Sequence, residues 1–143
     1  MLMASPASRL RDNRMNRLRI FLALLLLVPA SAPAQEWRMA PEYDVLLSSY
    51  DISPQEIRLP AGKAVRLRFV NNSNQSHDFS APGFFGHAKL RDRDRSTING
   101  GRISVQPLGA RTIALVPEKG RYKVRSGGLF HRVFGMTAVI VVE

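Results

Sequence analysis

Apolar and polar residues alternate in short segments along most of the chain. In the segment AVRLRFV, the apolar residues Val65, Leu67 and Phe69 are separated by Arg66 and Arg68. A period of two places successive side chains on opposite faces of a strand. We therefore predict a half-buried strand here, with its three apolar side chains in a core and its two arginines in water.

Similar segments follow one another to the end of the chain. We predict further strands at residues 43–49, 56–59, 77–79, 103–105, 111–116, 122–125 and 137–142. Turn signals such as Pro60-Ala61-Gly62-Lys63 separate them. Outside the N-terminal region no long apolar segment has the helical period of 3.6. The pattern predicts an all-β fold, an antiparallel β-sandwich of about seven short strands.

One connection, residues 81–102, shows no sustained period and is long for a compact domain. We predict a short helix near Phe84 to Arg91. The charges of the following segment LRDRDR alternate in sign, which predicts a solvated surface. His87 lies in this connection and would join a site elsewhere only if the connection folded over it.

The first 34 residues have the layout of a secretory signal peptide. Five arginines precede an apolar run, Ile20–Val28, and small residues follow, ending in Ala32-Pro33-Ala34. The alternative is a membrane anchor, but nine apolar residues fall well short of the ~20 that span a bilayer. We predict cleavage before Gln35.

The predicted organisation is a signal-peptide helix (1–34) followed by one β-sandwich domain (35–143). Such a protein is periplasmic or secreted and has no membrane span after cleavage. Met1, Met3 and Met15 all fit as the start, because each leaves basic residues before the apolar run.

The whole chain of 143 residues carries a formal net charge of +10, from 21 Lys and Arg against 11 Asp and Glu. Removing residues 1–34, with five arginines and Asp12, leaves 16 basic and 10 acidic residues and a net charge of +6. Such a surface steers a protein toward an acidic partner or anionic lipid headgroups, or serves only solubility. The chain has no cysteine, which excludes disulfides and every thiolate metal site.

Candidate metal ligands are few: the histidines His77, His87 and His131, and Met136. His131 stands five residues before Met136, between two predicted strands. This spacing lets one loop direct an imidazole and a thioether at a single metal ion. Each residue also has an ordinary structural interpretation, a surface side chain for the histidines and a core side chain for the methionine.

Several motifs together resemble the cupredoxins of the plastocyanin and azurin type. They are Asp51-Ile52-Ser53-Pro54, Ala61-Gly62, Val65 to Phe69, Asn71, Gly120-Arg121-Tyr122 and Gly135-Met136. The resemblance implies a Greek-key sandwich that holds a single copper ion for one-electron transfer. It also implies that His77, His131 and Met136 are the copper ligands.

Ser126 occupies the position where the resemblance places the cysteine ligand. A blue-copper site owes its electron-transfer properties to the copper–thiolate bond, and a neutral serine hydroxyl replaces neither its charge nor its covalency. What remains is a pair of imidazoles and one thioether. This donor set suits Cu(I) better than Cu(II) or Zn(II).

The function expected from the sequence is therefore an exported cupredoxin-like module for copper handling, binding one copper ion weakly or as Cu(I). A metal-free interaction module acting on another exported protein is the first alternative, and an electron carrier is the second. We expect a monomer. We also expect no enzymatic activity, since no serine lies in a G-x-S-x-G motif. Alternating charges and the absence of stacking aromatics in a basic groove oppose nucleic-acid binding.

Overall fold

The computed structural model describes residues 33–126 and 136–143. The signal-peptide helix predicted for residues 1–34 lies almost entirely outside these ranges, and so does His131. The first described helix, α2 (Pro33–Met39), spans the cleavage point predicted before Gln35. Within the described ranges, no helix is long and apolar enough to cross a bilayer.

The described residues form ten strands and three short helical segments. The helices besides α2 are α3 (Pro82–His87) and a 3₁₀ turn, η1 (Asp92–Thr97). The strands are β1 (Glu42–Leu47), β2 (Ile52–Ser53), β3 (Glu56–Leu59), β4 (Val65–Asn71), β5 (His77–Ser80), β6 (Lys89–Leu90), β7 (Arg102–Val105), β8 (Ala110–Val116), β9 (Gly120–Ser126) and β10 (Met136–Val142). Every strand predicted from the sequence is present, and β2 and β6 are additional two-residue strands.

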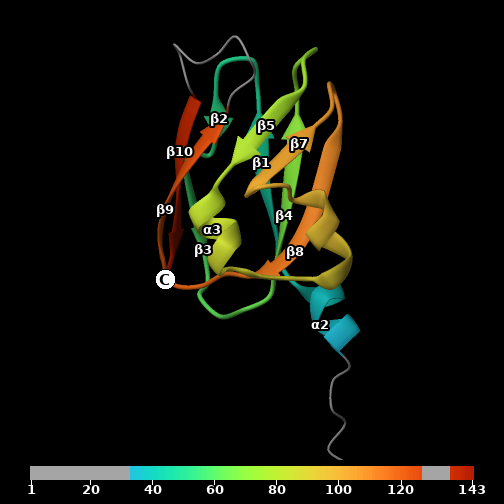
Figure 1. Ribbon diagram of the computed structural model, residues 1–143, viewed down its shortest axis with the longest axis vertical. Helices are drawn as coiled ribbons and strands as arrows, with labels where there is room; N and C mark the ends of the chain where they lie inside the picture. Colours follow the sequence, from blue (N-terminus) through green and yellow to red (C-terminus); the bar gives the residue numbers. More distant parts are fainter. Residues whose placement is uncertain (1–32, 127–135) are drawn as a thin grey trace, which may run out of the picture. The chain divides into compact units, whose positions relative to one another are not determined.

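The strands form two five-stranded sheets, shown in Figure 1. We call them the β1 sheet, with strand order β2-β1-β4-β8-β6, and the β9 sheet, with strand order β3-β10-β9-β5-β7. The predicted all-β sandwich is confirmed. Each sheet is mixed, however, because β1 pairs with β4 and β3 pairs with β10 in parallel. The chain passes from one sheet to the other between these partners, which lets them run in the same direction.

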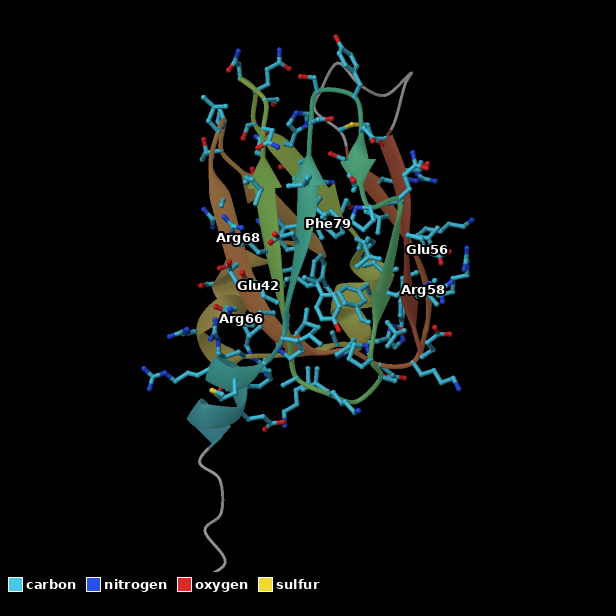
Figure 2. The ribbon with its side chains drawn as sticks, turned by 180° about the vertical axis from the view of Figure 1, so that it is seen from behind. Glu42, Glu56, Arg58, Arg66, Arg68 and Phe79 are labelled. Carbon is cyan, nitrogen blue, oxygen red and sulfur yellow. The ribbon has the colours of Figure 1, made fainter. Side chains whose placement is uncertain are left out.

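The side chains of β4 follow the pattern predicted from the sequence. Val65, Leu67 and Phe69 are fully buried, while Arg66 and Arg68 are less buried and form ion pairs with residues of the neighbouring β1 (Figure 2). The core lies between the sheets. It is joined across the middle by Phe69 of β4 and Phe79 of β5, whose ring centroids are 4.7 Å apart.

The long connection between β5 and β7 contains α3, β6 and η1, so the predicted short helix is present, although it begins earlier and ends at His87. The charged segment is not simply a solvated surface. Asp94 is buried, and its carboxylate accepts hydrogen bonds from Arg91 Nε and from the backbone N–H of Ala114, both at 2.8 Å. This carboxylate fastens η1 to β8.

Candidate functional site

The end of β9, the start of β10 and the start of β5 lie together at the upper end of the view in Figure 1. Ser126 is the direct cross-strand partner of Met136 on one side and of Phe79 on the other. Directly opposed residues point to the same face of a sheet, with Cβ atoms ~5 Å apart. All three are buried, so this is the inner face.

His77 is on the same patch of the inner face. It stands two residues before Phe79 on β5, so it is the diagonal neighbour of Ser126, a relationship that places Cα atoms ~7–8 Å apart. The exposed fractions of His77, Ser126 and Met136 are 2%, 2% and 6%. The structure thus brings two of the three predicted ligands, together with Ser126, where the resemblance places a cysteine, to one end of the β9 sheet.

The loop that delivers His77 to this end is held by Asn71, the last residue of β4. The side-chain amide of Asn71 lies within hydrogen-bond distance of three carbonyl oxygens, those of Gln75 at 2.7 Å, Gln106 at 3.0 Å and Val105 at 3.1 Å. Its Oδ1 accepts from the backbone N–H of Ser73 at 2.9 Å. One buried side chain therefore fastens the β4–β5 loop to the β7–β8 loop, and both border the site.

The Gly-x-Tyr motif at the start of β9 has a packing origin. A Cβ atom on Gly120 would lie 2.9 Å from Cζ and Oη of Tyr122, so the ring needs glycine beneath it. The hydroxyl of Tyr122 donates to the carbonyl oxygen of Glu118 at 3.0 Å. Burial, followed by the nearby Glu118 carboxylate, raises the pKa of Tyr122 above its ordinary value.

His87 is not part of the candidate site. It is exposed at the end of α3, with its Nδ1 2.7 Å from the Gly83 carbonyl oxygen. Its ring centroid is 6.2 Å from that of Tyr122. Tyr122 lies four residues before Ser126 on β9, a separation of ~13 Å along a strand. Among the described residues, His87 therefore lies away from His77, Ser126 and Met136.

The described donor side chains at this end are an imidazole, a thioether and a hydroxyl, all of them buried. Among the described residues, no group of three or more His, Cys, Asp or Glu side chains could hold a metal ion. The hydroxyl oxygen of Ser126 is buried and has no hydrogen-bond partner in the described part of the chain. An imidazole, a thioether and an unpartnered hydroxyl on one inner face fit a soft, low-charge metal ion better than a hard divalent one.

The sequence comparison concerns the family and the fold. The profile of the cupredoxin-like domain matches residues 18–142, which is most of the chain. The chain belongs to the cupredoxin-like family. A comparison with curated proteins gives no significant match.

Solved structures with the same fold include two auracyanins and a multicopper oxidase. This cupredoxin-like domain is 16% identical to the reduced auracyanin of the photosynthetic bacterium Roseiflexus castenholzii, with a TM-score of 0.52 over 73% of this chain and 97% of that one. Auracyanin B is 17% identical, with a TM-score of 0.50 over 73% and 89%. The multicopper oxidase of Pediococcus acidilactici is 13% identical, with a TM-score of 0.54 over 71% of this chain but 25% of the oxidase. At these identities the likeness establishes the fold.

Sequence reasoning missed the bracing role of Asn71 in this cupredoxin-like domain. The polar cluster NNSNQS marked a turn, but nothing in it distinguishes the buried Asn71 from the exposed Asn72 and Asn74. The signal that could have identified it was the alternation of buried and exposed positions along the strand. Asn71 continues the buried positions of β4 after Val65, Leu67 and Phe69, and a buried amide at such a position must find several partners.

Proposed function

We propose that this domain is an exported, non-catalytic copper-handling module that binds one copper ion, preferentially as Cu(I). His77 and Met136 are two of the ligands, and His131, which lies outside the described residues, is the third. The observation that carries the proposal is the clustering of buried donor positions at one end of the β9 sheet. Export follows from the predicted signal peptide.

The preference for Cu(I) rests on charge and donor softness. Transferring an ion into a buried site costs more as its charge rises, and the described donors supply no negative charge in return. Thioether and imidazole ligands suit Cu(I), whereas a blue Cu(II) site depends on a thiolate. The family and the multicopper oxidase neighbour support copper as the metal. Storage, delivery or tolerance fits this chemistry better than electron transfer.

The test is a Cu(I) titration under anaerobic conditions in competition with a chromophoric Cu(I) chelator, using protein recovered from the exported fraction. We expect one equivalent to bind, and we expect His77→Ala, His131→Ala and Met136→Ala each to weaken binding by about tenfold or more, as loss of a metal ligand should. His87→Ala is the matched control, because His87 lies at the other end of β9, and it should bind like the unaltered protein.

A metal-free interaction module is the second candidate. The observation that favours it is the buried Ser126 hydroxyl in the position expected for the cysteine, since that substitution removes the strongest copper ligand of the family. If the protein takes up no Cu(I) at micromolar concentrations, the copper proposal fails and the metal-free module replaces it.

A further inference from the structure

The outer face of β9 carries a row of cations. Arg121, Lys123 and Arg125 occupy alternate positions of the strand and are exposed. Alternate residues on one face of a strand are ~6.8 Å apart, so the row covers ~13 Å. We call these three residues the β9 cation row. It ends one residue before Ser126.

Ion pairing distinguishes this row from the cations of the other sheet. On the outer face of the β1 sheet, Arg66 pairs with Glu42 at 2.8 Å and Arg68 pairs with Asp44 at 3.4 Å. Figure 2 labels Arg66, Glu42 and Arg68 on this sheet. In the β9 cation row, Arg121 is 3.6 Å from Glu56, a carboxylate that Arg58 also contacts.

Lys123 and Arg125 form no ion pair with any residue that the structure describes. The positions beside them on the neighbouring strands are also uncharged. Thr137 is the partner of Arg125 and Val139 the partner of Lys123 on β10, and Ser80 is the partner of Arg125 on β5. Among the described residues, Lys123 and Arg125 therefore have neither an ion-pair partner nor a directly opposed charge.

We propose that the β9 cation row binds an extended acidic segment of a partner polypeptide, with carboxylates at alternate residues facing the row. An extended chain repeats its side chains on one face at the same ~6.8 Å spacing. A single extended segment lying along β9 would contact Lys123 and Arg125, whose direct partners on β10 and β5 are uncharged.

A flat anionic membrane fits the face less well than such a segment. Carboxylates flank the row on both sides, Glu56 on β3 and Asp78 on β5, where Asp78 is 3.7 Å from Arg102. A surface covering the whole sheet would meet these negative charges as well as the positive ones. The proposal concerns the outer face of the sheet, whereas the proposed copper ligands His77 and Met136 are buried on the inner face, so each proposal can fail without the other.

The test uses two peptides that carry the same number of glutamates separated by serines. One has glutamate at every second position and the other at every third. We expect the exported, metal-free protein to bind the peptide with glutamate at every second position more tightly than the other peptide at low salt. This binding should be lost near 1 M salt, where the Debye length falls to ~3 Å.

Two double variants with equal charge change locate the binding face. Lys123→Glu with Arg125→Glu should weaken binding of the first peptide by about tenfold or more, since each exposed attraction becomes a repulsion. Arg93→Glu with Arg111→Glu is the control, because both arginines are exposed and lie outside the β9 sheet, and it should bind nearly as well as the unaltered protein.

Three outcomes would overturn the proposal. One is equal loss of binding in both double variants, which would mean attraction by net charge alone. Another is equal affinity for the two peptides, which would remove the spacing argument. The third is binding to vesicles of anionic phosphatidylglycerol, abolished by the β9 double variant, with no binding of either peptide. Circular dichroism of both double variants verifies that they are folded.

Discussion

Ser126 and Met136 are direct cross-strand partners on the inner face of the β9 sheet, and the hydroxyl oxygen of Ser126 has no hydrogen-bond partner among the described residues. The position at which the family resemblance places the cysteine ligand is therefore buried beside the methionine. The resemblance then predicts that this position differs in its chemistry rather than in its backbone placement, and this prediction can be tested.

Ser126→Cys should create a blue Cu(II) site. The new thiolate would stand beside Met136 and diagonal to His77, which supplies the negative charge and the covalency that the hydroxyl lacks. The measurement is the visible spectrum after addition of Cu(II), in which an intense thiolate-to-copper absorption is expected. A colourless protein that still folds would show that the ligand geometry has changed together with the ligand.

Ser126→Ala is the matched control and carries its own prediction. It removes a buried hydroxyl that has no partner in the part of the chain that the structure describes, so the free energy of unfolding should rise by about 1 kcal/mol, and the affinity for Cu(I) should not change. Urea denaturation measures the first and chelator competition the second. Loss of Cu(I) affinity in this variant would mean that the hydroxyl is itself a ligand.

Asn71→Ala should lower the free energy of unfolding by about 3 kcal/mol, because it leaves buried carbonyl groups and the N–H of Ser73 without partners. It should also weaken Cu(I) binding, since the loop that carries His77 loses its brace. Asn74→Ala, at an exposed position of the same loop, should change neither quantity appreciably. If Asn71→Ala were as stable as Asn74→Ala in urea, the bracing role would be excluded.

Asp94→Asn and Asp92→Asn form a matched pair, because each aspartate contacts an arginine three residues away. The side chain of Asp94 is 10% exposed and that of Asp92 is 94% exposed. Removing the buried charge leaves Arg91 uncompensated and should cost about 2–3 kcal/mol, whereas the exposed change should stay within about 0.5 kcal/mol. Thermal unfolding of the two variants checks the difference, and similar melting temperatures would contradict it.

Tyr122 should make the stability fall at alkaline pH. Its pKa in the folded protein is raised above the ordinary value of 10.0, so the folded state holds the phenol proton more tightly than the unfolded state does. The stabilisation is complete below pH 10 and is lost as the pH rises through the folded pKa. Urea denaturation from pH 8 to pH 11.5 measures the fall, which should be smaller in Tyr122→Phe. If the stability of Tyr122→Phe fell by the same amount, the fall would be due to titratable groups other than Tyr122.

Local patterns predicted where the strands lie, but which strands pair with each other depends on residues far apart in the sequence. The alternation of β4 identifies its buried residues correctly, because every second side chain of a strand points to the same face. The parallel pairing of β3 with β10 joins residues more than eighty positions apart, and no local pattern contains it. Asp94 is a second example. Its carboxylate is buried because it accepts a hydrogen bond from the backbone N–H of Ala114, twenty residues further along, whereas the charged residues around it in the sequence predicted that it would be exposed to solvent.

The candidate site was predicted in part for the same reason. The order of His77, Ser126 and Met136 along the chain matched a family pattern, and their placement at one end of the β9 sheet follows from strand register. His87 could not be placed from the sequence, because the direction of α3 depends on its packing against Tyr122. The assignment of His77, His131 and Met136 as ligands stays a prediction until the titration is done.

The hydrogen bonds of Asn71 also bear on the entropy of metal binding. Fixing a backbone residue costs ~1–2 kcal/mol in conformational freedom, and residues 72–76 are fixed through Asn71 when the sandwich folds. If His77 binds copper as proposed, the loop that carries it is already ordered in the folded protein, so binding would require no further loss of conformational freedom there. Uptake and release of the ion would then need no rearrangement of this loop.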